Sequence, residues 1–258
     1  MKAKRIQDME RFLIEHGSST LEQLCHTFNV SENTIRRDIN QLIQNGLVKK
    51  VYGGVIISNK NYNLNSICHP SQLNYSKELD IIGEKAASMV NDGDIILISS
   101  GTTSYYMVRH LKNKKDITVI TNNIFVIIEA LNYDNIKLIV LGGDIHKSTN
   151  SIIGLEALVS LEKMNTHKVF LGANGLSINT GFTNSSNFEV EIKKAMVKAS
   201  DKIIVMADHT KFDVVSLYTF LGFKDVDVLI TDQLPNAQYI DCFAQNNVQL
   251  IVADDKPV

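Results

Sequence analysis

The chain has 258 residues, of which 44% are hydrophobic and 21% charged, with a formal net charge of -2. This composition is typical of a globular protein and argues against a disordered or fibrous one. The length predicts a small domain and a larger one. No apolar run approaches the ~20 residues that cross a bilayer, and the charged start contains no signal-peptide core. We therefore expect a cytoplasmic protein without a membrane partner.

The cysteines and histidines indicate neither a disulfide framework nor a metal site. Cys25, Cys68 and Cys242 are odd in number, far apart and in no CxxC pair, which favours plain thiols. The seven histidines are scattered and form no HxxxH or His/Cys cluster. We expect no metal and no other cofactor.

The first 58 residues predict a winged helix-turn-helix domain. Apolar residues at helical spacing predict a helix over 3–16, and Thr20 is a suitable N-cap for a second helix through Phe28. Ser31 then caps a third helix running to about Asn45. Two β-prone runs, 47–52 and 55–58, flank Gly53-Gly54 and predict a hairpin. Only this block is basic, with eight Lys/Arg against six acids.

Residues 59–75 predict a linker, because they are Asn-rich, contain Pro70 and show no sustained period. Residues 76–258 predict an α/β domain, because short apolar runs alternate with stretches long enough for helices. Such an alternation is typical of a mainly parallel sheet covered on both faces. The expected strands are Ile95–Ile98, Ile117–Ile120, Lys137–Leu141, Lys168–Leu171, Ile203–Met206 and Val226–Ile230, and the expected helices include 77–91, Thr103–Leu111 and Phe125–Leu131.

The third helix has a polar face that suits the major groove of DNA. A helical wheel places Asn33, Arg37, Asn40 and Gln44 opposite the apolar face, with Arg36 beside them. Guanidinium and amide groups read guanine and adenine edges, and hydroxyls at a helix N-terminus contact phosphate. A merely solvated helix face is the alternative, but the capped helix, the tight turn and the basic hairpin together favour DNA. The predicted DNA contacts are Ser31, Asn33, Thr34, Arg36, Arg37, Lys49 and Lys50.

The same region resembles the DeoR family of bacterial transcriptional regulators. The resemblance includes Arg5, Met9, Leu13, Ser31 and the run Thr34–Ile39, and the stretch Tyr52–Val55 is similar to the wing of that family. It implies that the chain binds double-stranded operator DNA.

The ends of the predicted strands share small and polar residues. Because the carboxyl ends of parallel strands form the ligand crevice of an open sheet, we expect these loops to converge on one site. Gly101-Thr102-Thr103 leads into a helix and offers backbone N–H groups and hydroxyls to an anion, and Lys211 adds a positive charge. A phosphorylated sugar or polyol fits such a crevice, although each loop alone could be ordinary turn chemistry. The predicted contacts from the strand ends are Ser99, Gly101, Thr102, Thr103, Thr121, Asn122, Gly142, Gly143, Asn174, Gly175, Asp208 and Lys211.

The DeoR resemblance extends over this second domain. It implies a fold similar to ribose-5-phosphate isomerase and a sugar-phosphate effector, and it adds Thr183 and Glu189 to the expected site. The chain carries Ser99, His146 and Asn174 where members commonly have Asp, Arg and Asp.

Two alternatives remain. A sugar-phosphate isomerase-like enzyme with an accessory DNA-binding domain needs an ionisable base, and Asn174 cannot ionise. Glu189, Glu191 and Asp208-His209 are conceivable bases. At helical spacing, however, Glu189, Glu191, Lys193 and Lys194 are more simply a charged helix surface. The second alternative, a winged helix that contacts protein, would expose apolar residues instead of Arg37 and its neighbours.

We therefore expect a DNA-binding regulator that is not an enzyme. By family resemblance it is a repressor of a carbohydrate-utilisation operon whose operator binding is modulated by a phosphorylated sugar. Paired winged helices on symmetric operators require a homo-oligomer, either a dimer or a tetramer.

Overall fold

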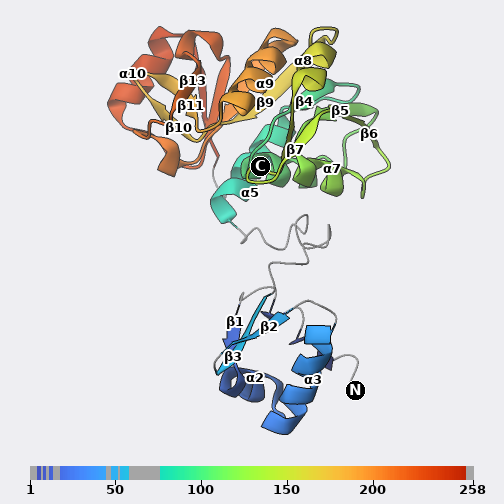
Figure 1. Cartoon of the computed structure of the whole chain (residues 1–258). Helices are drawn as coiled ribbons and strands as arrows, with labels where there is room; N and C mark the ends of the chain where they lie inside the picture. The colour runs from blue at the N-terminus through green and yellow to red at the C-terminus, as the bar shows by residue number, and fades with distance from the viewer. Residues whose placement is uncertain are drawn as a thin grey trace. The chain divides into compact units, whose positions relative to one another are not determined.

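The computed structural model describes residues 5, 6, 8, 9, 12, 13, 18–44, 48–51, 53–57 and 76–253. The chain divides into two compact units, Met1–Asn74 and Tyr75–Val258, and each is described by itself (Figure 1). The predicted linker 59–75 and Cys68 lie outside the described residues. Within the described part of the chain, no helix has the length and apolarity needed to cross a membrane, and Cys25 and Cys242 are free thiols.

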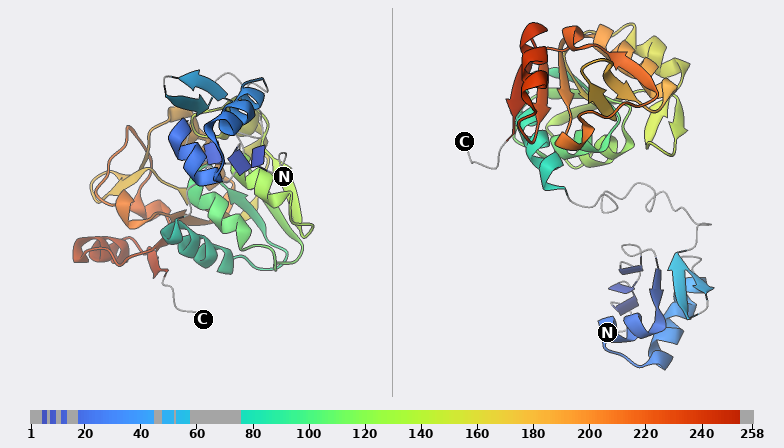
Figure 2. Two further views of the ribbon diagram at one scale, coloured as in Figure 1. Left: turned by 90° about the horizontal axis from the view of Figure 1, so that it is seen from below. Right: turned by 90° about the vertical axis from the view of Figure 1, so that its left-hand side faces the viewer.

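The first unit is a winged helix-turn-helix, as predicted. Residues 5, 6, 8, 9, 12 and 13 are helical, and the three strands form an antiparallel sheet in the order β1-β3-β2. The right-hand view of Figure 2 shows these strands beside the helices of the unit. The elements are β1 (Ser18–Thr20), α2 (Leu21–Phe28), α3 (Glu32–Gln44), β2 (Val48–Val51) and β3 (Gly54–Ile57).

Local capping fixes where α2 begins and ends. The Thr20 hydroxyl accepts from the Gln23 amide at 3.1 Å, and the Gln23 side chain accepts from the Thr20 amide at 3.0 Å, which forms a capping box. Asn29 ends the helix in the left-handed region, with φ 49°. The core beneath α2 and α3 contains Met9, Leu13, Leu24, Ile35 and Leu42, all of them buried.

Strand β1 is absent from the sequence prediction, because three small polar residues carry no strand pattern of their own. Pairing with β3 creates it: Ser19 lies opposite Val55 and Thr20 opposite Gly54. A Cβ atom at Gly54 would lie 2.3 Å from the Ser19 carbonyl oxygen. The glycine therefore permits the close approach that adds the third strand to the wing.

The second unit contains a seven-stranded parallel sheet in the order β15-β14-β12-β9-β4-β5-β6. The predicted parallel sheet is confirmed, and β15 is an additional strand that the sequence analysis missed. The strands are β4 (Ile95–Ile98), β5 (Ile117–Thr121), β6 (Ile136–Val140), β9 (Thr166–Gly172), β12 (Ser200–Met206), β14 (Val228–Thr231) and β15 (Gln249–Val252).

Helices cover both faces of this sheet. Apolar residues of α5, α6 and α7 pack with Ile96, Ile98 and Phe170 on one face, and those of α8, α9 and α10 pack with Leu97 and Val169 on the other. Figure 1 shows α8 and α9 on the side of β4 and β9 opposite to α5. The helices are α5 (Lys77–Ser88), α6 (Thr102–Arg109), α7 (Ile124–Ala130), α8 (Leu155–Leu161), α9 (Asn187–Lys198) and α10 (Ala237–Gln245).

Three smaller features escaped prediction, because their strands are short and their pairing is set by distant segments. A hairpin of β7 (Asp144–His146) and β8 (Ser151–Ile153) follows β6. A second sheet has the order β10-β11-β13. Its strands are β10 (Gly175–Ser177), β11 (Gly181–Asn184) and β13 (Tyr218–Leu221), and two 3-10 turns lie at His209–Lys211 and Phe223–Asp225.

Candidate DNA-binding and effector sites

The polar face predicted on α3 is exposed. Asn33, Arg37 and Asn40 lie in solvent, whereas Ile35 and Ile39 are buried in the core of the unit. Gln44 is the last residue of the helix, and its side chain lies outside the described part of the structure.

The start of α3 presents hydroxyl groups. The Ser31 and Thr34 hydroxyl oxygens are 3.0 Å apart. The Ser31 carbonyl accepts from the amides of Thr34 and Ile35 at 2.9 and 3.0 Å. This places both hydroxyls at the positive end of the helix, where a phosphate oxygen is favoured.

The two arginines of α3 differ in their surroundings. Arg36 reaches back one turn to Glu32, with Nη2 and Nε at 2.5 and 2.9 Å from the same carboxylate oxygen. Arg37 is exposed, and no described residue forms an ion pair with it. A guanidinium without a carboxylate partner keeps all its donors for another molecule, so Arg37 is the stronger candidate for reading a base edge.

A buried ion pair fixes α3 against the first helix. Arg5 Nε donates to Asp38 Oδ2 at 2.7 Å, and the Asp38 side chain is 1% exposed. In the sequence, these two residues stand out only as members of the DeoR family pattern. An acidic residue among basic ones on the proposed recognition helix was the available signal that it has an internal partner.

The two wing lysines extend to opposite faces of the sheet. Lys50 lies opposite Val55, which is buried, and Lys49 lies opposite Ile56, which is exposed. Consecutive strand residues alternate between faces. Both lysines are exposed. Because they extend from opposite faces of the sheet, they do not form one continuous basic surface.

In the second unit, the strand order reverses between β4 and β9, and this is where we place the candidate ligand crevice. The chain runs from β4 outward through β5 to β6, and then from β9 outward through β12 and β14 to β15. Strand order reverses at this point, which is where open α/β sheets bind ligands. Ser99 follows β4 and accepts from the Gly172 amide through its hydroxyl at 3.3 Å, so the two strand ends lie side by side.

The N-terminus of α6 lies at this crevice. Gly101 is its N-cap, with φ 129° and no side-chain hydrogen bond to the helix, and Gly101 and Thr102 are exposed. The first amides of α6 therefore lack a capping side chain, which leaves donors and a positive dipole end for an anion. Asn123, which the site prediction omitted, donates to the Gly101 carbonyl at 2.9 Å and accepts from the Phe125 amide at 2.9 Å.

Two predicted hydroxyls are already used by the backbone. Thr121 Oγ1 donates to the Ile98 carbonyl at 2.7 Å and accepts from the Asn123 amide at 3.0 Å. Thr183 Oγ1 donates to the Gly175 carbonyl at 3.0 Å and accepts from the Ser216 amide at 2.9 Å. Both threonines are fully buried. Their geometry favours a structural role in shaping the loops.

The predicted glycines allow chain segments to approach one another. A Cβ atom at Gly143 would lie 2.2 Å from the Ile153 carbonyl oxygen, and one at Gly175 would lie 2.3 Å from that of Val214. Gly142 is exposed and its nearest contact would be 3.8 Å away. Gly143 and Gly175 are therefore required by packing.

Two amides line the same rim. Asn122 Nδ2 donates to the Ile152 carbonyl at 3.0 Å, while its Oδ1 is buried without a partner among the described residues. Asn174 is exposed, and its Oδ1 accepts from the Ser185 amide at 3.1 Å. His146 is part of β7 and its Nδ1 lies 2.9 Å from the Thr149 hydroxyl.

Glu189 and Lys193 correct the expectation of a charged helix surface. Both are buried, one turn apart on α9. Glu189 accepts from the Ser100 hydroxyl at 2.6 Å, and Lys193 donates to the Gly172 carbonyl at 2.7 Å. Burial lowers the pKa of Lys193 to about 8, partly opposed by the charge of Glu189. Glu189 and Lys193 are four residues apart and therefore share the inward face of the helix. Only Glu191 and Lys194 form the expected surface pair, at 3.2 Å.

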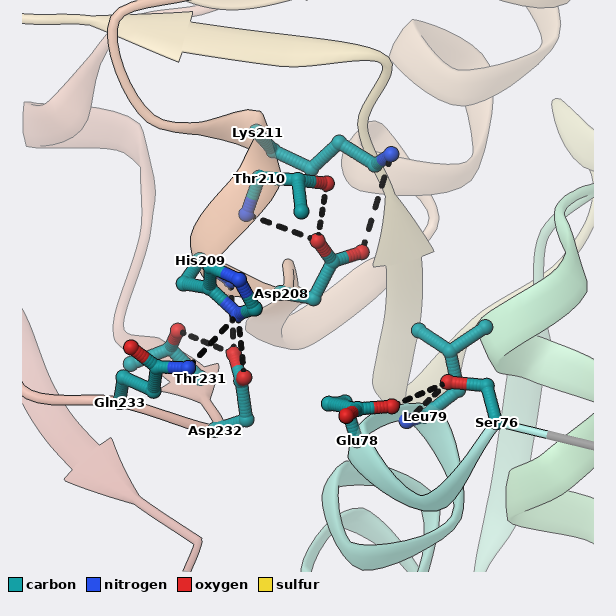
Figure 3. Close-up of polar contacts among 10 residues, drawn as sticks. All are labelled: Ser76, Glu78, Leu79, Asp208, His209, Thr210, Lys211, Thr231, Asp232 and Gln233. Carbon is teal, nitrogen blue, oxygen red and sulfur yellow. Dashed lines mark hydrogen bonds and ion pairs between the residues drawn. The ribbon is translucent and has the colours of Figure 1, made fainter.

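Beyond β12, Asp208 organises the turn that carries Lys211 (Figure 3). Its Oδ1 accepts from the Thr210 amide at 2.9 Å and from the Thr210 hydroxyl, and its Oδ2 lies 3.7 Å from Lys211 Nζ. The predicted cation is thus partly exposed and close to a carboxylate.

Next to it, His209 lies against Asp232, which follows β14. The Asp232 carboxylate accepts from the His209 amide at 2.7 Å and lies 2.6 Å from Nδ1. The close-up also shows Glu78 of α5 and Ser76, the N-cap residue of that helix (Figure 3). Hydrogen bonds from its own amide and from the Ser76 hydroxyl lower the pKa of Glu78, and the charge of His209 adds to this effect.

A winged helix-turn-helix followed by an α/β domain whose strand order reverses between β4 and β9 defines a transcriptional regulator built from two units. The chain belongs to the DeoR family: the sequence model of the DeoR-like helix-turn-helix domain matches residues 5–61, and that of the DeoR C terminal sensor domain matches residues 75–233.

Curated relatives match almost the whole chain. The HTH-type transcriptional regulator IolR of Bacillus subtilis is 34% identical over 98% of this chain and 100% of its own. The lactose phosphotransferase system repressor of Lactococcus lactis is 30% identical over 95% and 96%, and the glycerol-3-phosphate regulon repressor of Escherichia coli is 25% identical over 92% and 93%. The protein is therefore a DNA-binding transcription regulator and not an enzyme.

A solved structure also matches part of the chain. Ribose 5-phosphate isomerase A of Methanocaldococcus jannaschii aligns with 52% of this chain and 53% of its own, at 17% identity and a TM-score of 0.38. The fold class itself follows from the sheet topology and the family matches given above.

Proposed function

We propose that this regulator is a cytoplasmic repressor of a carbohydrate-utilisation operon, and that a phosphorylated sugar or polyol modulates its binding to operator DNA. The names of two relatives support this: one represses a lactose phosphotransferase system and another a glycerol-3-phosphate regulon. We assign residues 1–58 to DNA binding, 59–75 to a linker, and 76–258 to effector sensing and oligomerisation.

The exposed face of α3 carries the proposed DNA contact. Arg37 and Asn33 reach base edges, while the Ser31 and Thr34 hydroxyls contact phosphate at the start of the helix. Arg36, Lys49 and Lys50 supply backbone contacts beside it. A dimer or tetramer presents two such helices to a symmetric operator.

The uncapped N-terminus of α6 at the strand-order reversal is the single observation that carries the effector proposal. Its amides and the Thr102 and Thr103 hydroxyls bind the phosphate, with Lys211 as a counter-charge. The sugar hydroxyls face polar groups of the neighbouring strand ends, among them Asn122 and Asn174. The buried Asn122 Oδ1 is an acceptor without a partner among the described residues, and a hydroxyl donor suits it.

A thermal-shift screen tests the effector. Phosphorylated sugars and polyols are compared with the same compounds lacking phosphate, and a ligand at about 100 times its Kd stabilises the folded domain by roughly 2.7 kcal/mol. We expect shifts with phosphorylated compounds only. Equal shifts with unphosphorylated partners, or none with either, would contradict the anion site. A gel-shift titration with duplex DNA of the protein's own promoter region tests the proposed DNA binding.

A further inference from the structure

Near the start of the second unit, Ser76 is hydrogen-bonded to α6, the helix whose N-terminus is the proposed phosphate site. We call Ser76 the entry point of the unit. Ser76 is the first described residue of this unit and the N-cap of α5. Its backbone amide donates to the hydroxyl of Tyr106 at 2.9 Å. Ser76 also accepts from the Leu79 amide at 3.3 Å and donates to Glu78 at 2.9 Å through its side chain. The chain entering the sensor domain is therefore held by a side chain of α6.

Tyr106 lies one helical turn after Thr102 on α6. Its side chain is 1% exposed, so its hydroxyl position follows the position of the helix. The N-terminal amides of α6 thus face the proposed phosphate site, and Tyr106, one turn later, contacts Ser76. An anion that shifts or orders the start of α6 therefore also affects the hydrogen bond to Ser76.

Helices α5 and α6 are packed too closely to move separately. A Cβ atom at Gly83 of α5 would lie 2.7 Å from the Met107 amide nitrogen and 2.8 Å from the Tyr106 carbonyl carbon. Backbones in such contact transmit small displacements, because a close-packed interior does not absorb them. A movement of α6 therefore reaches Ser76 through the hydrogen bond and through α5.

The entry point also lies beside a second strand end of the crevice. Glu78, in the first turn of α5, is within electrostatic range of Asp208 and His209, and Figure 3 shows the three in one view. Occupation of the crevice next to Asp208 and Lys211 changes the charge around the first turn of α5. The start of the sensor domain is thus influenced from both α6 and β12.

We propose that Tyr106 is the positioning residue that couples occupation of the α6 N-terminus to Ser76, and through Ser76 to the DNA affinity of the chain. The inference rests on the proposed function, because it requires an anion at the strand ends. It adds the route by which the bound effector changes DNA binding.

Tyr106→Phe in the full chain tests this coupling, with Tyr105→Phe as the matched control. Both remove one buried hydroxyl from the same helix. The Tyr105 hydroxyl interacts with Glu129 of α7 and not with the entry point. Thermal unfolding without phosphate establishes that each variant is folded.

The probe is inorganic phosphate at constant ionic strength, and three quantities are measured. These are phosphate binding by calorimetry, hydrogen exchange of a peptide covering Ser76–Leu79, and affinity for duplex DNA of the protein's own promoter region. In the wild type and in Tyr105→Phe, we expect phosphate to change DNA affinity by about fivefold or more and to alter exchange at Ser76. In Tyr106→Phe, phosphate binding stays within about twofold of the wild type, but the change in DNA affinity is lost.

The outcomes separate the two proposals. If Tyr106→Phe binds phosphate and keeps the wild-type change in DNA affinity, the coupling role of Tyr106 is overturned while the effector site stands. If phosphate does not bind the wild type, the effector site is overturned, and the coupling inference is overturned with it.

Discussion

Arg5 and Asp38 are joined by a 2.7 Å ion pair although the Asp38 carboxylate is almost fully buried under α3. The pair connects the first helix to the proposed recognition helix. Because the carboxylate is buried, this ion pair holds α3 in place from inside the unit.

Arg5→Ala therefore destabilises the first unit. It leaves a buried carboxylate without its partner, which costs about 3 kcal/mol, whereas replacing both residues by Met and Leu restores most of this loss. Urea unfolding of the full chain, followed by far-UV circular dichroism, measures the difference. A single variant as stable as the wild type would contradict the structural role of the pair.

Arg37→Ala weakens binding to specific DNA. The side chain is exposed without a described ion-pair partner, and loss of one base contact costs about 1 to 3 kcal/mol. Arg36→Ala is the comparison, because Arg36 is held by Glu32, and we expect a smaller and less sequence-dependent loss. Gel-shift titrations against specific and scrambled duplexes measure both. Undiminished affinity of Arg37→Ala for the specific duplex sinks this assignment.

Thr102→Val weakens the response to a phosphorylated effector and leaves DNA binding without effector unchanged. The variant keeps the helix start but removes a hydroxyl from the anion site, at a cost of about 1 to 3 kcal/mol in ligand affinity. Thr102→Ser retains the hydroxyl and is the control. Calorimetry with a compound identified in the thermal-shift screen measures the affinities. Equal affinities of Thr102→Val and the wild type would remove Thr102 from the site.

Lys193 makes the free energy of unfolding of the second unit change with pH above about 8. Its pKa is about 8 in the folded chain against an ordinary value of 10.5. Between these values the unfolded chain binds a proton that the folded chain lacks, so stability rises with pH from about 8 upward. Below pH 8 the buried charge opposes folding.

Lys193→Met removes this rise. Urea unfolding at intervals between about pH 7.5 and 9 compares the variant with the wild type, below the range in which tyrosines titrate. The difference in unfolding free energy between the two proteins changes with pH if Lys193 titrates as described. A pH-independent difference would show that its pKa is not lowered.

Helical and strand periods visible in the sequence predicted the elements that position both sites. The polar face of α3, the capped start of α2 and six strands of the large sheet all follow local patterns. Thr102, Asn122 and Gly142 follow β4, β5 and β6, whose carboxyl ends share one edge of the parallel sheet, and their role in binding an effector stays a prediction. In each case the signal lies within about ten neighbouring residues, which is the range over which periodicity is informative.

Contacts between distant segments could not be predicted in this way. Glu189 and Lys193 have the spacing of a solvated helix face, and only the fold shows that they are turned toward Ser100 and Gly172. Thr121 and Thr183 look like ligand hydroxyls until their backbone partners are known. Strand β1 exists only because β3 lies next to it.

The two bonds from α9 have a consequence for how this sensor can diversify. Helix α9 forms hydrogen bonds on both sides of the reversal point, with Ser100 after β4 and with Gly172 at the end of β9. The spacing of these two contacts is then fixed by the single helical turn between Glu189 and Lys193. If the rim binds the effector as proposed, we expect ligand preference to change through the exposed side chains of the rim, while the buried contacts of α9 hold the two strand ends together.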